Sequence, residues 1–587
     1  MDSSAPEASR RTARASLVES VRDCTLAGVR ISKEELRRKL TMPEYLRLAV
    51  TDAIESKDID GAADRHRLSA GESAESPEFP LVVFINRNSG GRHGPKLKAR
   101  LQDLMAKEQV FDLQCVEPDQ FVEYGLRCLE KLALGDLCAK QTREKLRVVV
   151  AGGDGTVGWV LGCLGELHVQ RREPVPPTAV IPLGTGNDLS RSFGWGGSFP
   201  FNWKSAIKNT LDRAGRGQEC HLDSWNISIS MPAKEIVHRP HCLKPVKECY
   251  LDQGLEIGVL PEKVSYYKGV FYNYFSIGMD AQVAYGFHNL REKKPHLAKG
   301  PVSNKLIYSG YTCAQGWFFA PCMSDPKLRG LNNILKMFIK KTNCSNWEEV
   351  SIPPSSSWLL LCNRTIYSSP LPLPALADVT RQKGPSCHQQ TPDSLSLKKP
   401  AIALILLQHQ IIILLLLAMI EDPHQISSIC SAPDLPLLAG LCWVLLLLSG
   451  ILCLELIGDG FWHCVRSIVA LNLNNYASGR NPWGKLKPDY LEKRGFRQAR
   501  VDDGLLEIFG LKQGWHASFV MADLISAKHI AQAAMIRFEF RGGERKEAYL
   551  QMDGEPWKQP IVEDYSAFVE IKGVPFRSVM INGTVSS

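Results

Sequence analysis

Three glycine-containing turns in the sequence combine residue types that bind phosphate. They are Ser89-Gly90-Gly91, Gly152-Gly153-Asp154-Gly155-Thr156 and Gly184-Thr185-Gly186-Asn187-Asp188, and Asn86 precedes the first. Glycine lets an anion approach consecutive backbone N–H groups because no Cβ blocks the way, and the Thr156 hydroxyl can add a donor. A carboxylate aimed at phosphates repels them unless a cation lies between, so Asp154 in the second turn indicates bound Mg²⁺.

Other nucleotide-binding motifs fit these residues poorly. Gly153-x-Gly155-x-x-Gly158 matches the dinucleotide fingerprint, but Thr178–Leu183 lacks the acidic residue expected at the end of the next strand. An NAD-dependent dehydrogenase is therefore disfavoured. The stretch Gly90–Lys96 lacks the spacing and the Ser/Thr of a Walker motif, and the H-R-D and D-F-G elements of protein kinases are absent. One glycine-rich turn is often only a turn, whereas three at successive strand ends favour a shared ligand site.

Alternating strands and helices are predicted to position these turns. The apolar runs Leu81–Ile85, Val148–Ala151 and Thr178–Leu183 each precede one turn, and the clearest helix-period segments between them are Lys96–Lys107 and Val157–Leu167. Strands that are apolar on both faces and separated by helices indicate a parallel sheet covered on each side. The fold class is therefore α/β, with an open sheet whose carboxyl ends carry all three turns.

A second, mostly β domain is predicted after Asp223, where short β-rich runs replace the alternation. We expect it to be a sandwich or a distorted barrel. The runs are Trp225–Ser230, Tyr272–Ile277, Val465–Leu473, Gly504–Gly510, Met535–Phe540, Ala548–Met552 and Ala567–Ile571.

The first 79 residues are predicted to be a partly disordered tail followed by short helices. Residues 1–31 are rich in arginine, as in a basic tail or an organelle-targeting peptide. Ser32 with Glu35, and Thr41 with Glu44, fit capping boxes that predict two helices ending near Ile54. The polar run 55–78 has no hydrophobic period and is interpreted as a linker.

Residues 358–464 fit neither domain. Ala401–Ile420 and Leu437–Ile457 are long and apolar enough to pass as membrane spans of ~20 residues each. However, Gln408–Gln410 and Glu455 would be costly in lipid, and the segment interrupts the β domain. We interpret it as a non-native or disordered insertion in preference to a transmembrane hairpin. We therefore predict two domains. Residues 80–222 form the α/β domain. Residues 223–357 and 465–587 together form the accessory β domain, which is expected to end in a C-terminal return of the chain.

The three turns resemble the catalytic domain of diacylglycerol kinases, and motifs in the β region resemble the accessory domain of that family. The similarity covers about 80–345 and 465–575, and the stretch Leu26–Ala49 is similar to that of compact plant members, which lack C1 domains. The motifs are Asn86-x-x-Ser89-Gly90-Gly91, Gly152–Thr156, Pro182–Arg191, Tyr274–Ala281, Asn304-Lys305, Asn481–Gly484, Asp503–Leu505 and Asp553–Trp557.

The resemblance implies ATP-dependent phosphorylation of diacylglycerol to phosphatidic acid. It implies Asp154 and Asp188 near the metal ions, Asp553 as the catalytic base and Glu555 as its neighbour. At spacing i, i+2 in a strand these two carboxylates would share a face, and their repulsion would raise a pKa; an alternative for Asp553-Gly554 is a simple β-turn. The implied ATP-binding residues are Asn86, Ser89, Gly90, Gly91, Gly152, Gly153, Asp154, Gly155, Thr156, Gly184, Thr185, Gly186 and Asn187.

Composition agrees with a kinase acting at a membrane surface. The 587 residues are 44 % hydrophobic and 22 % charged with a net charge of +8, which is too mildly basic to indicate nucleic acid. No N-terminal stretch resembles a signal peptide and none of the 17 cysteines forms a C-x-x-C pair, so we expect a cytoplasmic, peripherally membrane-associated protein with reduced thiols. Diacylglycerol lies in a bilayer, and Arg291, Lys293, Lys294 and Lys299 could contact an anionic lipid surface.

Two alternatives to diacylglycerol kinase stay open from the sequence. One is a kinase of another acceptor, a sphingoid base or NAD, although sphingoid-base enzymes would be expected to have serine where this chain has Gly152. The other is a non-catalytic membrane protein, which depends on residues 401–457 alone. Nothing in the sequence specifies an oligomeric state.

Overall fold

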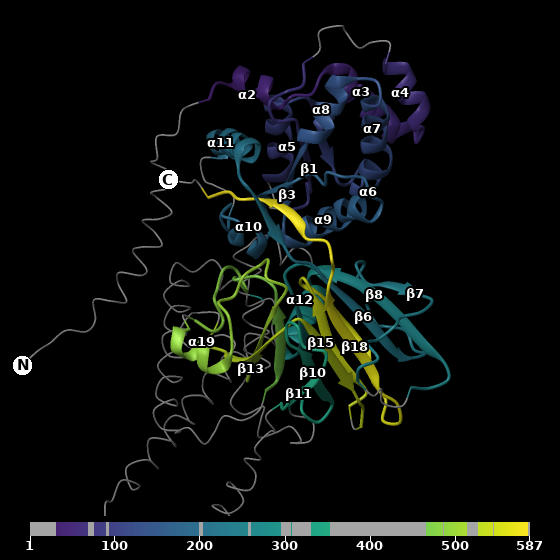
Figure 1. Cartoon of the computed structure of the whole chain (residues 1–587), viewed down its shortest axis with the longest axis vertical. Helices are drawn as coiled ribbons and strands as arrows, with labels where there is room; N and C mark the ends of the chain where they lie inside the picture. Colours follow the sequence, from purple (N-terminus) through teal and green to yellow (C-terminus); the bar gives the residue numbers. More distant parts are fainter. Residues whose placement is uncertain are drawn as a thin grey trace, which may run out of the picture. The chain divides into compact units, whose positions relative to one another are not determined.

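The structure is a computed structural model of the whole chain (Figure 1). It describes residues 31–67, 75–89, 93–198, 203–255, 260–294, 307, 330–352, 465–484, 486–512, 520, 526–543 and 545–584. The predicted insertion 358–464, with both candidate spans, lies outside the described residues. Within the described ranges, no helix combines the length and apolar character needed to cross a membrane.

A six-stranded sheet carries the glycine-rich turns. Its order is β2-β1-β3-β4-β19-β5, in which β2, β1, β3 and β4 are parallel and β19 runs parallel to β4 but antiparallel to β5. The predicted parallel sheet is confirmed. The strands are β1 (Leu81–Ile85), β2 (Val110–Asp112), β3 (Arg147–Gly152), β4 (Thr178–Pro182), β5 (Glu219–Leu222) and β19 (Ser578–Ile581).

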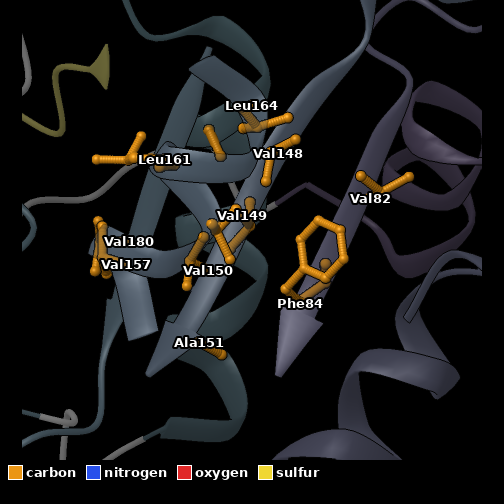
Figure 2. Packing of buried hydrophobic residues seen from close by; sticks show 14 of the residues in the cluster. Val82, Phe84, Val148, Val149, Val150, Ala151, Val157, Leu161, Leu164 and Val180 are labelled. Atoms are coloured by element: carbon orange, nitrogen blue, oxygen red, sulfur yellow. The ribbon is translucent and has the colours of Figure 1, made fainter. Parts of the chain in front are cut away.

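Apolar side chains on both faces of this sheet fix it between helices. In α9 (Asp154–Val169), Val157, Leu161 and Leu164 recur at helical spacing and are at most 2 % exposed. Figure 2 shows them over Val148–Val150 of β3. Each buried leucine contributes roughly 1.5–3 kcal/mol. The other helices of this part are α5 (His93–Leu104), α6 (Pro118–Gln120), a π-helical turn (Phe121–Leu126), α7 (Arg127–Ala133), α8 (Leu137–Lys145), α10 (Asp188–Ser192) and α11 (Trp203–Arg216).

The N-terminal helices agree only in part with the sequence prediction. Helix α2 (Lys33–Leu40) begins as predicted, because the Ser32 hydroxyl accepts a hydrogen bond from the Glu35 N–H at 3.0 Å. The predicted second capping box is wrong, since α3 (Glu44–Ser56) begins after Pro43 without a side-chain cap. The predicted linker is also wrong in part, because α4 (Ile59–Arg67) lies within it. It packs against α3 and α7 through Ala62 and Ala63, which are too small to give a hydrophobic period.

Two antiparallel sheets form the predicted β sandwich. One has the order β11-β10-β15-β18-β6-β8-β7 and the other β14-β13-β12-β9-β16-β17. Their inner faces share one core, in which the rings of Phe275 and Phe538 lie 5.8 Å apart. The strands are β6 (Trp225–Pro232), β7 (Lys244–Val246), β8 (Val264–Phe271), β9 (Tyr274–Gly278), β10 (Leu335–Lys340), β11 (Glu348–Val350), β12 (Ser467–Leu471), β13 (Leu506–Leu511), β14 (Lys528–Ala533), β15 (Met535–Phe540), β16 (Glu547–Met552), β17 (Glu555–Pro560) and β18 (Ala567–Gly573), with helices α12 (Met279–Lys293) and α19 (Pro488–Arg494).

The end of the chain ties the sandwich to the parallel sheet. After β18 the chain leaves the sandwich and enters the parallel sheet as β19, yellow in Figure 1. The Trp195 indole donates to the Ile581 carbonyl at 2.8 Å, and the Arg213 guanidinium donates to the Gly583 carbonyl at 2.9 Å. Residues far apart in sequence therefore hold the C-terminal strand, which follows β18 of the sandwich, in the parallel sheet.

A buried ion pair stabilises one face of the sandwich. The Arg537 side chain is fully buried and donates to Glu570 Oε2 from Nε at 2.9 Å and from Nη2 at 2.6 Å. The guanidinium also lies 5.0 Å from the Trp347 ring centre. Because both charges are removed from water, neither can lose its partner without a large penalty.

We predict that Arg537→Met lowers the free energy of unfolding by about 3–5 kcal/mol, because Glu570 is left buried without a cation. Denaturant unfolding followed by circular dichroism measures the loss. Lys341→Met is the matched control, since the Lys341–Glu348 pair is more than half exposed and should be worth at most about 1 kcal/mol. Similar small losses in both variants would contradict this account of the pair.

Candidate functional site

The second and third glycine-rich turns, and the described part of the first, 86–89, lie side by side at one edge of the parallel sheet. Hydrogen bonds join the adjacent parallel strands as far as their carboxyl ends. There the Asn86 N–H donates to the Ala151 carbonyl at 3.0 Å, and the Leu183 N–H donates to the Gly152 carbonyl at 2.9 Å. The second and third turns touch, because a Cβ on Gly184 would lie 2.6 Å from the Gly153 Cα. Only glycine allows this approach.

The first turn is held by the Asn86 side chain. Its Oδ1 accepts a hydrogen bond from the Asn88 N–H at 3.1 Å, and its Nδ2 donates to the Thr156 hydroxyl at 3.2 Å. The Ser89 N–H donates to the Asn86 carbonyl at 3.1 Å. Asn86, Ser89 and Thr156 are thus brought together, whereas Gly90 and Gly91 lie outside the described residues.

The third turn is fixed by Asn187. This buried residue adopts a left-handed conformation with φ 58°. Its Oδ1 accepts from the Gly184 N–H, and its Nδ2 donates to the Gly184 carbonyl, both at 2.8 Å. The asparagine side chain and the polar main-chain groups of Gly184 are therefore used within the turn, which leaves the Gly186 N–H for a ligand.

The carboxylates of Asp154 and Asp188 both approach Gly186 of the third turn. A Cβ on Gly186 would lie 3.4 Å from an Oδ2 atom of each aspartate. The Asp154 carboxylate accepts from the backbone N–H groups of Asp188 and Leu189, at 2.9 and 3.1 Å. The Asp188 carboxylate accepts from the N–H groups of Ser478 and Gly479, at 3.2 and 2.6 Å.

This crowding changes the acidity of Asp154. Burial, followed by the charge of Asp188, raises its pKa from the ordinary aspartate value to about 7, although its two backbone donors act in the opposite direction. The charge of Asp553 adds to the rise. A carboxylate so destabilised as an anion has a strong electrostatic reason to bind a cation.

Asp553 occupies a tight hairpin turn between β16 and β17. Met552 pairs with Glu555, and the two turn residues, Asp553 and Gly554, have φ 49° and 84°, as in a type I′ turn. The β-turn interpretation is thus confirmed, and it does not separate this residue from the site. A Cβ on Gly158, one turn along α9 from Asp154, would lie 3.7 Å from Asp553 Oδ2.

Three main-chain donors hold the Asp553 carboxylate. Its Oδ1 accepts from the N–H groups of Asn273 and Tyr274, at 2.8 and 3.0 Å, and its Oδ2 accepts from the Tyr272 N–H at 2.8 Å. Burial is the largest cause of a pKa raised to about 6, against the lowering effect of these three donors. Because Oδ2 accepts one of these hydrogen bonds and Oδ1 accepts two, Oδ2 is the oxygen that retains more capacity for a proton.

The predicted sharing of one strand face by Asp553 and Glu555 is wrong. Asp553 lies in the turn in a left-handed conformation, whereas Glu555 begins β17. The Glu555 carboxylate instead accepts a hydrogen bond from the Cys242 thiol at 3.2 Å. Its charge raises the pKa of Asp553 less than burial does, so mutual repulsion is the minor cause.

The sequence analysis missed the segment that holds Asp188. Ala477, Ser478 and Gly479 have φ 49°, 77° and 92°, three left-handed residues in succession, two of which carry a Cβ. Such strain persists only where surrounding contacts enforce it, and here it aims two N–H groups at Asp188. The signal in the sequence was weak, because a single glycine in Ala-Ser-Gly predicts an ordinary turn.

The donor set fits magnesium bound together with phosphates. Across the described ranges, no group of three acidic, histidine or cysteine side chains forms a ready metal cage. Magnesium is commonly held by one or two carboxylates together with phosphate oxygens and water. Asp154 and Asp188, which both approach Gly186, supply that number of carboxylates.

We predict that Gly184→Ala lowers the free energy of unfolding by about 1–3 kcal/mol, because the new methyl group would meet the Gly153 backbone and the Asn187 side chain, at 2.6 and 2.8 Å. Gly155→Ala is the matched control in the neighbouring turn. A Cβ there meets nothing within 4 Å, and alanine is favoured over glycine in a helix, so stability should be equal or higher. Thermal melts of both variants measure the difference; equal melting temperatures would show that the turns do not touch.

Comparison with known proteins agrees with this architecture. Residues 80–218 match the family model of the diacylglycerol kinase catalytic domain, and residues 270–378 and 461–556 match that of the diacylglycerol kinase accessory domain. Diacylglycerol kinase 7 of Arabidopsis thaliana is 52 % identical over 583 residues, which cover 98 % of this chain and 96 % of the relative. Diacylglycerol kinase 3 of the same plant is 52 % identical over 569 residues, covering 96 % and 94 %. The resemblance found in the motifs is therefore confirmed, and the chain belongs to the diacylglycerol kinase family.

Proposed function

We propose that this protein transfers the terminal phosphoryl group of ATP to the free hydroxyl of diacylglycerol, giving ADP and phosphatidic acid. The observation that carries the proposal is the gathering of Asp154, Asp188 and Asp553 beside three glycine-rich turns at one sheet edge. Family membership supports the kinase activity and its use of ATP. It does not favour the alternatives of a sphingoid base, NAD or a non-catalytic membrane protein.

The turns are proposed to bind the triphosphate through their main chain. Glycine removes side-chain obstruction around the main chain of these turns, although the Gly184 N–H is already bonded to Asn187. Helix α9 begins at Asp154, so its positive dipole end lies at the second turn. Asn86 and Thr156 would hold the first turn against the second. In this proposal the predicted ATP-binding residues bind the nucleotide or shape the turns that bind it. None of them supplies or accepts a proton.

Asp154 and Asp188 are proposed to hold Mg²⁺. The ion would neutralise charge on the phosphate oxygens during transfer. Main-chain donors on each carboxylate fix its direction before any ligand arrives, which reduces the reorganisation that binding requires. The raised pKa of Asp154 agrees with a carboxylate placed where a cation belongs.

Asp553 is proposed to accept the proton of the acceptor hydroxyl. As the hydroxyl oxygen attacks the terminal phosphorus, its proton passes to Asp553 Oδ2 and the bond to ADP breaks. A pKa near 6 suits this task, because the carboxylate is ionised at neutral pH and still retains proton affinity. Glu555 is placed beside it as an acidic neighbour, and its bond to Cys242 keeps its side chain in one orientation.

The acceptor lies in a bilayer, so we propose peripheral binding to an anionic lipid surface. Arg291, Lys293 and Lys294 are exposed at the end of α12, and each could add about 1 kcal/mol at an anionic leaflet. Lys299, the fourth residue of the predicted basic cluster, lies outside the described residues. Helix α12 packs on β17, the strand that begins at Glu555, so this basic end belongs to an element next to the proposed acceptor site.

Labelled ATP tests the function directly. We predict transfer of the terminal label to diacylglycerol in mixed vesicles, and none to a sphingoid base or NAD. Asp154→Ala should lower this transfer at least about 100-fold while the circular dichroism spectrum is unchanged. Label appearing in a sphingoid base but not in diacylglycerol would overturn the assignment of the acceptor, and an active Asp154→Ala variant would overturn the metal role.

The pH dependence tests Asp553. A base must be ionised to act, and burial raises the pKa of Asp553 to about 6, so kcat/KM should fall about tenfold per pH unit below that value and level off above it. The profile should be measured at two saturating Mg²⁺ concentrations. If the acidic fall in kcat/KM occurs at the same pH at both Mg²⁺ concentrations, the titrating group is the proton acceptor. If the fall moves to lower pH with more Mg²⁺, the titrating group is a metal ligand instead.

A further inference from the structure

Arg191 is a cation threaded between two glycines at the edge of the third turn. A Cβ on Gly197 would lie 1.7 Å from the Arg191 Cζ, and a Cβ on Gly479 would lie 2.8 Å from its Cδ and 3.2 Å from its Nη1. The side chain thus passes through a channel that exists only because both neighbours are glycine. Gly197 follows the third turn in sequence, whereas Gly479 comes from the segment after β12 in the sandwich.

The guanidinium lies in this channel without an anionic partner among the described residues. Among the residues that the structure describes, its one hydrogen bond is from Nε to the Gly186 carbonyl at 3.4 Å, and none of their carboxylates forms an ion pair with it. The nearby Asp188 carboxylate accepts instead from the N–H groups of Ser478 and Gly479. A half-buried guanidinium with five donors and one long bond has unused capacity for an anion.

The sandwich fixes the position of this channel. Asn475 Nδ2 donates to the Ser192 hydroxyl at 3.0 Å, and the Ser478 hydroxyl donates to the Thr185 carbonyl at 3.4 Å, so the segment is fastened to the last residue of α10 and to the third turn. Behind it, Tyr476 and Trp483 pack edge-on against Phe509 of β13, with ring centres 5.4 and 6.0 Å away. The strained run 477–479 is therefore held from two sides.

We propose that Arg191 binds the terminal phosphate of the nucleoside triphosphate and that Gly479 of the sandwich positions the Arg191 side chain. This inference rests on the proposed function. The guanidinium adjoins Gly186, whose Cβ direction points between Asp154 and Asp188, so a phosphate bridged to a cation there comes within reach of Arg191. An arginine fork pairs with two phosphate oxygens at once, and its charge offsets charge that moves onto them during transfer.

Equilibrium titration of the full chain with ATP, ADP and AMP in the presence of Mg²⁺ tests the proposal. Arg191→Gln, which removes the charge but keeps a polar group on a shorter stem, should weaken the binding of ATP about 10- to 100-fold, that of ADP less, and that of AMP by no more than about twofold. Gly479→Ala should move the ATP-to-AMP affinity ratio in the same direction, because its methyl group displaces the arginine. Gly495→Ala is the control: this glycine is also left-handed, with φ 64°, but a Cβ there meets nothing within 4 Å, so the ratio should stay at the wild-type value.

The outcomes separate this inference from the proposed function. An Arg191→Gln variant with the wild-type ratio overturns the phosphate contact, and so does equal weakening of all three nucleotides, because a merely structural role would not depend on the terminal phosphate. If Arg191→Gln does not fold, the ATP-to-AMP affinity ratio is measured for Arg191→Lys instead, because lysine retains the charge but not the two-pronged guanidinium. A wild-type protein that binds none of the nucleotides would instead overturn the proposed function.

Discussion

The structure depends on holding three mutually repelling carboxylates together with main-chain N–H groups. Asp154 accepts two such hydrogen bonds, Asp188 two and Asp553 three. These donors fix where the carboxylates point but only partly offset their charge, and the pKa values of Asp154 and Asp553 stay raised. The sheet edge is therefore an anionic site built rigidly in advance, and a cation with phosphates satisfies it better than water alone.

These main-chain donors also explain why neither the α/β part nor the sandwich forms the site alone. Asp188 belongs to the α/β part, but its donors come from residues 478 and 479 after β12. Asp553 belongs to the sandwich, but it lies against Gly158 of α9. A return of the C-terminal strand β19 to the parallel sheet keeps the two parts in register. In this account the accessory region acts by completing the site, as well as by any contact it makes with lipid.

Sequence reasoning succeeded where one local rule determined the structure and failed where distant contacts did. Leu81–Ile85 is buried on both faces, so its apolar run predicted β1 with correct bounds. The three turns followed from the topology of parallel strands. Helix α4 escaped notice because it packs through alanines, and the conformation of Ser478 could not be read because it is imposed by Asp188, which lies 290 residues away along the chain. The placement of Asp553 at the site came from the family resemblance; its tight turn alone gave no such information.

Diffraction from crystals grown with Mn²⁺ and a non-hydrolysable ATP analogue would test the central claim most directly, because the anomalous signal locates the metal independently of the protein phases. The account predicts a peak between the carboxylates of Asp154 and Asp188, with the phosphates against the main chain of the glycine-rich turns. A metal peak away from both carboxylates, or phosphates bound at another edge of the sheet, would contradict it.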